Sequence, residues 1–139
     1  MQSGYTILEH PADLGIEAHG KTLAEAFEQA AIGMMSVILD LSSVECHELQ
    51  KIELHADDLE QLLVRWLGDI LYRYDGQKFV SKECTIQRLT TSELIAIVRG
   101  EHFSSEKHRT KLDVKAITYH QLLIREDERG GYVKFFLDI

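Results

Sequence analysis

Segment 59–74 repeats large apolar residues at helical spacing, and this stripe constrains the fold more than any other feature of the chain. Asp57, with Glu60 three residues later, matches the start of a capped helix. A helix with so broad an apolar stripe must lie against another layer, and a sheet is a surface that can cover it. We interpret Trp66 as an anchor of that interface. The stripe consists of Leu59, Leu62, Leu63, Trp66, Leu67, Ile70, Leu71 and Tyr74.

A second amphipathic helix is predicted after Thr22. Thr22 and Glu25 have the spacing of a capping box, and apolar residues follow at helical positions up to Ile38. Met34 and Met35 could form an adaptable binding surface, but methionines in such a stripe more often fill a core. We therefore predict a helix whose apolar side is buried.

The remaining periodic segments are predicted to be strands. Segment 14–19 alternates between apolar and polar residues, which indicates a half-buried strand, whereas 94–98 is apolar throughout and suits a central strand. The predicted strands cover residues 5–8, 14–19, 51–56, 79–89, 93–100, 112–124 and 132–139.

The order is two strands, a helix, a strand, a helix and four strands. Connections after residue 76 are short and favour antiparallel pairing. We therefore predict an α+β fold, a two-layer sandwich with both helices on one face of a mixed or antiparallel sheet. A chain of 139 residues fits one domain, residues 1–139.

Composition narrows the classes of partner. Fifteen Lys and Arg against 23 Asp and Glu give a formal net charge of -8, which disfavours direct binding to RNA or DNA. An acidic surface suits a basic protein partner, although solubility explains the same charge. No apolar run is long enough to span a membrane, and residues 1–5 lack the features of a secretory signal. We expect a cytoplasmic protein in which Cys46 and Cys84 stay reduced.

Several common motifs are missing from the sequence. No glycine-rich phosphate loop is present, and the seven histidines form no recognised zinc pattern. Ser104 and Ser105 near His108 lack the glycine-flanked turn of a nucleophilic serine. The polar segment 101–111 is consistent with either a functional loop or a disordered one.

The end of the chain carries the clearest candidate site. The α-carboxylate of Ile139 would follow directly on the side chain of Asp138, and Asp13 is our candidate for a third carboxylate. Such a cluster would bind a hard cation through oxygen or retain a proton. The alternative is a solvated acid at a frayed end.

Segments 112–124 and 132–139 are predicted to form a hairpin that turns about Arg129 and Gly130. A regular hairpin would place Asp138 near Tyr119 or His120. Along a regular strand, Lys115 would then lie about 15 Å from Asp138, too far for direct contact unless the chain bends.

Four stretches, in this order and spacing, together resemble the archease family. They are residues 10–16 (HPADLGI), 100–101 (GE) followed by 107–108 (KH), 114–120 (VKAITYH) and 138–139 (DI). The two predicted helices also stand where that family has its helices.

The resemblance implies a function. Archeases are cofactors of the RtcB-type tRNA-splicing ligase, which joins RNA ends with GTP and a divalent metal. The resemblance implies an accessory protein that promotes guanylylation and multiple turnover of the ligase, touching tRNA or other RNA only indirectly. It also marks Asp13, Asp138 and the terminal carboxylate of Ile139 as metal-binding groups, for calcium, magnesium or manganese.

Other positions match the family motifs without an assigned role: His10, Lys107, His108 and Lys115. Two positions depart from the family pattern. Pro11 stands where threonine is usual, and Ser104 stands where many members carry an aspartate. Neither departure touches the three proposed metal-binding groups.

Two alternative functions remain open. The same carboxylates, with His108 and Lys115, could serve a stand-alone metal-dependent phosphoesterase. A general chaperone-like interaction protein would instead bind partners without using these acids.

Overall fold

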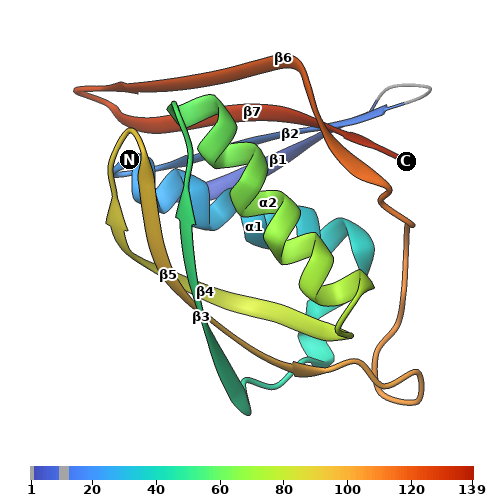
Figure 1. Cartoon of the computed structure of the whole chain (residues 1–139). Helices are drawn as coiled ribbons and strands as arrows, with labels where there is room; N and C mark the ends of the chain where they lie inside the picture. Colours follow the sequence, from blue (N-terminus) through green and yellow to red (C-terminus); the bar gives the residue numbers. More distant parts are fainter. Residues whose placement is uncertain (1, 10–12) are drawn as a thin grey trace.

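The computed structural model describes residues 2–9 and 13–139 (Figure 1). His10 and Pro11, which belong to the first motif, lie outside the described residues. The strands are β1 (Gly4–Glu9), β2 (Asp13–Gly20), β3 (Glu48–His55), β4 (Phe79–Leu89), β5 (Glu93–His102), β6 (Ala116–Asp127) and β7 (Gly130–Asp138). The helices are α1 (Leu23–Ile38) and α2 (Leu59–Asp75), with a 3-10 turn at Leu41–Ser43.

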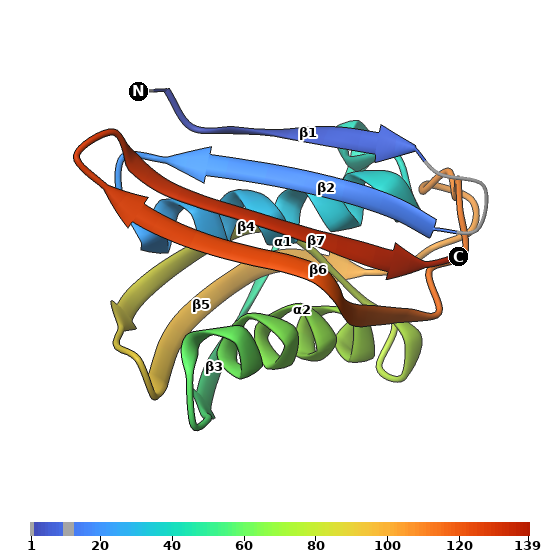
Figure 2. The same ribbon diagram turned by 90° about the horizontal axis from the view of Figure 1, so that it is seen from above.

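The strands form two antiparallel sheets. One has the order β1-β2-β7-β6 and the other the order β3-β5-β4. The predicted α+β class, element order and antiparallel pairing are confirmed. The division into two sheets was not predicted, and both helices lie in the layer between them (Figure 2).

Helix α1 explains why a second sheet is needed. It contacts β2 and β7 on one side and β4 on the other. Its buried residues surround most of the helix, so one sheet alone would leave part of this apolar surface in water. They are Leu23, Ala26, Phe27, Ala30, Ala31, Gly33, Met34, Met35, Val37 and Ile38.

Trp66 joins the two helices. Its side chain is fully buried, and its indole N–H donates to the backbone carbonyl of Phe27 at 2.9 Å. The hydrogen bond satisfies the one polar group of a large buried side chain. Trp66 was predicted to anchor α2 against a sheet, whereas this hydrogen bond joins α2 to α1. Among the described residues, no helix is long and apolar enough to cross a membrane.

The two helix starts differ in how well they were predicted. Thr22 caps α1 by accepting from the N–H of Glu25 at 3.1 Å, as expected. The prediction of Asp57 as the cap of α2 was wrong by one residue. Asp58 is the cap and accepts from the N–H of Gln61, whose side chain in turn accepts from the N–H of Asp57. Gln61 thus completes the reciprocal pair expected of Glu60.

This geometry predicts unequal effects for two neighbouring acids. Asp58→Ala should lower the free energy of unfolding by about 1 kcal/mol, because an N–H group of the first turn loses its acceptor. Asp57→Ala keeps that acceptor and should change stability by less than about 0.5 kcal/mol. Urea unfolding followed by circular dichroism measures both. Equal losses would contradict the assignment of Asp58 as the cap.

Candidate functional site

The pairing of β2 with β7 brings the two predicted metal-binding aspartates together. Asp13 and Asp138 are direct partners in the antiparallel register. The next residues inward, Leu14 and Leu137, are both buried in the core. Because side chains alternate along a strand, Asp13 and Asp138 lie on the face that points away from the helices. Directly opposed residues on one face have Cβ atoms about 4.5–5.5 Å apart.

We define Asp13 and Asp138 as the acid pair. Ile139 directly follows Asp138 in the chain. The side chain of Ile139 is partly buried against the core, and this contact favours an ordered chain end over a frayed one. Asp13 is half-buried and Asp138 is exposed. The structure thus places the residues Asp13, Asp138 and Ile139 at one end of the four-stranded sheet.

A break in the β6–β7 register corrects the predicted neighbours of Asp138. The hairpin begins regularly at Asp127 and Gly130, but the register shifts between Thr118 and Leu123. Asp138 therefore pairs with Ala116, and the prediction that it lies near Tyr119 or His120 was wrong.

The same break changes the position of Lys115. The backbone N–H of Lys115 donates to the carbonyl of Asp138 at 2.8 Å. The separation of about 15 Å expected for a regular strand does not apply, because the strand is irregular between Thr118 and Leu123. Gln121, inside the break, has a positive φ of 52°, a conformation that a regular strand does not use. β6 also begins at Ala116 and not at residue 112 as predicted.

A second polar cluster forms around Glu101, at the end of β5. Its carboxylate accepts from the backbone N–H of Glu45 at 2.8 Å and from Nε2 of His108 at 2.9 Å. The ammonium of Lys107 contacts both Glu101 oxygens, at 3.0 and 2.9 Å, and also Oε1 of Glu45 at 2.6 Å. The cluster therefore attaches segment 101–111 to the connection before β3.

His108 is buried, and its partners define which ring nitrogen carries the proton. Nδ1 accepts from the backbone N–H of Ser104 at 3.0 Å, so Nε2 is the nitrogen that donates to Glu101. The His108 ring also packs against Phe103, with centroids 5.7 Å apart. These contacts hold segment 101–111 in a defined conformation.

The donors around Glu101 change the acidity of the cluster. Three hydrogen bonds lower the pKa of Glu101 from 4.5 to about 2. The bond from the N–H of Glu45 has the largest effect, and the bonds from Lys107 and His108 come next. Lys107 likewise lowers the pKa of Glu45, and the two carboxylates raise the pKa of Lys107. Glu101 is thus an anion at any ordinary pH.

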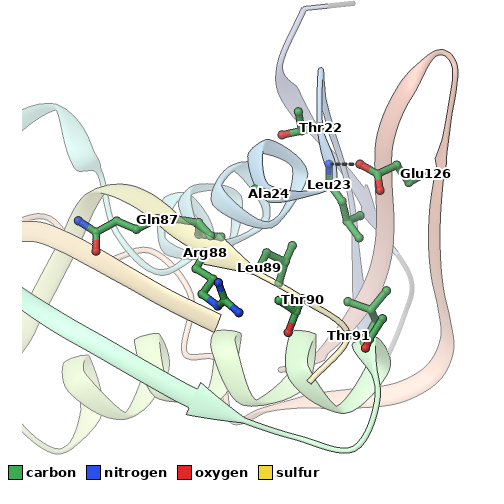
Figure 3. A pocket seen from close by; sticks show the side chains of 11 residues that line it. Thr22, Leu23, Ala24, Gln87, Arg88, Leu89, Thr90, Thr91 and Glu126 are labelled. Carbon is green, nitrogen blue, oxygen red and sulfur yellow. Dashed lines mark hydrogen bonds between the residues drawn. The ribbon is translucent and has the colours of Figure 1, made fainter. Parts of the chain in front are cut away.

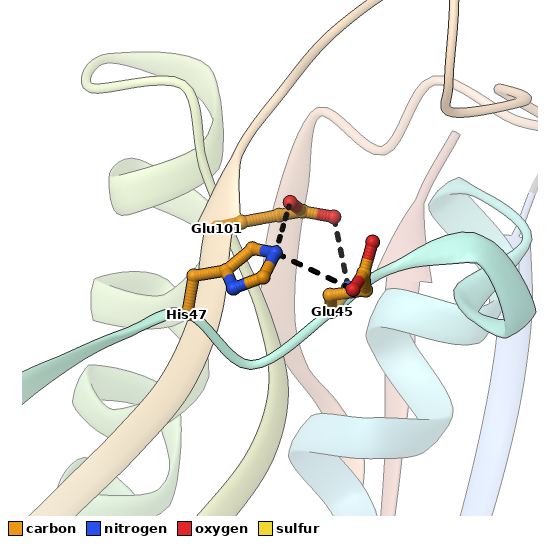
Figure 4. A group of neighbouring side chains, drawn as sticks. All are labelled: Glu45, His47 and Glu101. Atoms are coloured by element: carbon orange, nitrogen blue, oxygen red, sulfur yellow. Dashed lines mark hydrogen bonds and ion pairs between the residues drawn. The ribbon is translucent and has the colours of Figure 1, made fainter.

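Two groups of histidine and glutamate in the described part of the chain have ligand atoms within 4.8 Å of one another. One is Glu45, His47 and Glu101 (Figure 4); the other is Glu53, His55 and Glu93. Sequence reasoning missed both groups. Glu45 and His47 lie more than 50 residues from Glu101, and no local spacing indicates that they meet.

A pocket of about 330 Å³ lies elsewhere, between the start of α1 and the end of β4 (Figure 3). Glu126 from β6 lines it and accepts from the backbone N–H of Leu23 at 3.0 Å. The carboxylate therefore occupies the position at the helix start where an anion would bind. Neither the acid pair nor the Glu101 cluster lines this pocket.

Comparison with known proteins gives consistent matches over nearly the whole chain. Residues 5–139 match the family described as "Archease protein family (MTH1598/TM1083)". Proteins named "Protein archease" are 36% identical in Sulfolobus acidocaldarius and 41% identical in Saccharolobus islandicus, each over 97% of this chain and 98% of the relative.

Solved structures show the same fold. Protein 1598 of Methanobacterium thermoautotrophicum has a TM-score of 0.80 and 30% identity, covering 98% of this chain and 99% of its own. An archease of Thermotoga maritima, described as a possible chaperone, has a TM-score of 0.67 and covers 100% of this chain and 98% of its own. At 19% identity, the second match supports the fold alone.

The pKa of Glu101 predicts a pH-dependent contribution to stability. Since the pKa falls from 4.5 to about 2, the contacts of the carboxylate stabilise the fold above about pH 4.5 and are lost as the pH falls toward 2. Glu101→Gln should therefore lower the urea midpoint at pH 7, and its difference from the wild type should shrink toward pH 3.

Glu106→Gln is the matched control, because Glu106 is an exposed glutamate in the same segment. Its urea midpoint should follow the wild type at every pH. A difference between wild type and Glu101→Gln that stays constant from pH 7 to pH 3 would contradict the assigned role of the carboxylate.

Proposed function

The chain belongs to the archease family, and from this premise we propose that it is an accessory protein of an RtcB-type RNA ligase in tRNA splicing and RNA repair. It promotes guanylylation of the ligase with GTP and so supports multiple turnover. It is not itself the catalyst of ligation.

The acid pair is the observation that carries this proposal. Two carboxylates that oppose each other on neighbouring strands destabilise the pairing unless a cation lies between them. Carboxylate oxygens are the ligands of hard divalent ions, so the donor set fits calcium, magnesium or manganese. Asp13, Asp138 and the α-carboxylate of Ile139 would hold the ion. When bound, it would supply positive charge for phosphate oxygens.

Lys115 adds a fixed neighbour to this site. Its backbone N–H is committed to the carbonyl of Asp138, while its residue is exposed. The backbone contact holds the base of the lysine side chain beside the acid pair. The ammonium would then attract the phosphates of a nucleotide bound by the ligase.

The overall charge supports a protein partner more than direct RNA binding. A formal net charge of -8 opposes a nonspecific grip on a polyanion. Contact with RNA is therefore proposed to occur through the ligase.

The rival functions lack a comparable observation. A phosphoesterase needs an available general base, but both nitrogens of His108 are engaged, one by Ser104 and one by Glu101. A general chaperone, the role named as possible for the Thermotoga maritima structure, would not need the acid pair. Both rivals make different predictions in the experiment below.

Multiple-turnover ligation tests the proposal, with limiting cognate ligase, GTP, manganese and substoichiometric amounts of this protein. The wild type should stimulate ligation, whereas Asp13→Asn and Asp138→Asn should lose most of the stimulation. Glu17→Gln is the matched control, because Glu17 lies on the same strand and face as Asp13 but opposes Lys134.

Each other outcome identifies a rival. Full stimulation by Asp138→Asn would contradict the acid-pair mechanism and favour the chaperone-like function. Hydrolysis of nucleotides or RNA ends by this protein alone, abolished by Asp13→Asn, would favour the phosphoesterase.

The role of Ile139 needs a separate variant. Adding two residues after Ile139 keeps its side chain against the core but moves the α-carboxylate away from Asp138. Loss of a residue that only supports a metal ligand lowers metal affinity by roughly 10- to 100-fold. Manganese affinity, measured by isothermal titration calorimetry, should fall by at least this factor when a ligand itself is moved. Unchanged affinity would remove the α-carboxylate from the site.

A further inference from the structure

The spacing around His47 differs from that of a hydrogen-bonded cluster. Its Nε2 lies 3.4 Å from Oε2 of Glu45 and 3.8 Å from Oε1 of Glu101 (Figure 4). Charge-assisted hydrogen bonds are shorter, about 2.7–2.9 Å. Ligand atoms that share a tetrahedral ion with bonds of about 2.0–2.2 Å lie about 3.3–3.6 Å apart. The 3.4 Å pair has this spacing and the 3.8 Å pair is slightly wider, and all three ligand atoms lie within 4.8 Å of one another, so a small movement of the exposed His47 ring would let them share a cation.

We propose that Glu45, His47 and Glu101 form a second cation site, which binds Zn²⁺ through two carboxylate oxygens and Nε2 of His47. The fourth tetrahedral position is left open. The site lies outside the acid pair, and its existence does not depend on the function proposed above.

Residues that are not themselves proposed ligands hold Glu101 in position. Its Oε2 accepts from the buried His108, and the side chain of Glu101 is only 12% exposed. The other nitrogen of His108 is fixed by the N–H of Ser104. Partners of this kind orient a ligating carboxylate and reduce the entropy lost when a metal binds. Glu101 thus holds Oε1 in a rigid position, where a cation would replace the ammonium of Lys107 that contacts this oxygen at 3.0 Å.

Lys107 is the competitor of the metal. Its ammonium contacts Oε1 of Glu45 at 2.6 Å, while Oε2 of the same carboxylate faces His47. A divalent ion at the site would be repelled by this ammonium, which is 35% exposed and also contacts both oxygens of Glu101. Removing the ammonium should therefore tighten metal binding.

Cys46 lies between Glu45 and His47 in the sequence but outside the site. Its thiol interacts with Glu83, and burial is the main cause that raises its pKa. A thiolate is a strong zinc ligand, so a substitution at Cys46 distinguishes the proposed site from cysteine binding.

The group of Glu53, His55 and Glu93 provides an internal control. It has the same residue types, with His55 Nε2 3.5 Å from Glu53 Oε2. However, the guanidinium of Arg88 binds Glu93 at 2.5 Å. Arginine keeps its charge at any ordinary pH and binds carboxylates strongly. Zinc should therefore not displace the guanidinium of Arg88 from Glu93.

Calorimetric titration of the untagged full chain with Zn²⁺ alone tests the proposal. We expect one zinc site in the wild type, retained in Asp138→Asn, Cys46→Ser and His55→Ala and lost in His47→Ala. Lys107→Met should bind zinc about tenfold more tightly. His47 is 61% exposed, so its loss should leave the thermal unfolding midpoint unchanged without zinc.

Other results would overturn the proposal. These are no zinc binding by the wild type, full binding by His47→Ala, or loss of binding in Cys46→Ser or His55→Ala. Weaker binding by Lys107→Met would also contradict it. Loss of zinc binding in Asp138→Asn would assign the zinc to the acid pair. If the wild type binds zinc at this site but does not stimulate the ligase, only the proposed function is rejected.

Discussion

The pairing of β2 with β7 is the constraint on which the rest of the structure depends, because it joins the two ends of the chain. Leu14 and Ile16 on β2 and Phe135 and Leu137 on β7 lie in the core. A slip of one residue would turn these apolar side chains to the outer face and bury the acid pair, so the hydrophobic pattern strongly disfavours it. The same burial that stabilises the sheet thus places the two carboxylates directly opposite each other at its end.

The β6 irregularity then determines what surrounds the acid pair. β6 is an edge strand, and the extra residues between Thr118 and Leu123 shift its pairing with β7. Without this shift, the start of β6 would extend past Asp138, and the backbone of Lys115 would have no contact with it. An edge strand tolerates such an interruption, and irregularities of this kind commonly redirect side chains near functional sites. The register break therefore brings the backbone of Lys115 into contact with one member of the acid pair.

Sequence reasoning succeeded where the determining interactions are local. The cap at Thr22 and the α1 stripe depend on residues within a few positions of each other, as does the order of strands and helices. It failed where distant segments decide. Nothing near Gln121 indicates that a strand breaks there, and the Glu101 cluster depends on Glu45, which is 56 residues away. Asp13 and Asp138 were inferred from chain-end chemistry and family resemblance, and the hydrophobic alternation of their strands explains why they meet.

The central proposal is that the acid pair is a metal site formed by strand register. Paramagnetic broadening by Mn²⁺ in the amide spectrum of the ¹⁵N-labelled protein tests that claim most directly, because broadening falls steeply with distance from the ion. At substoichiometric Mn²⁺, we expect the amides of Leu14, Asp138 and Ile139 to broaden first, and we expect this effect to disappear when Asp13→Asn and Asp138→Asn are combined. Broadening that persists in the double variant, or that spares these amides in the wild type, would contradict it.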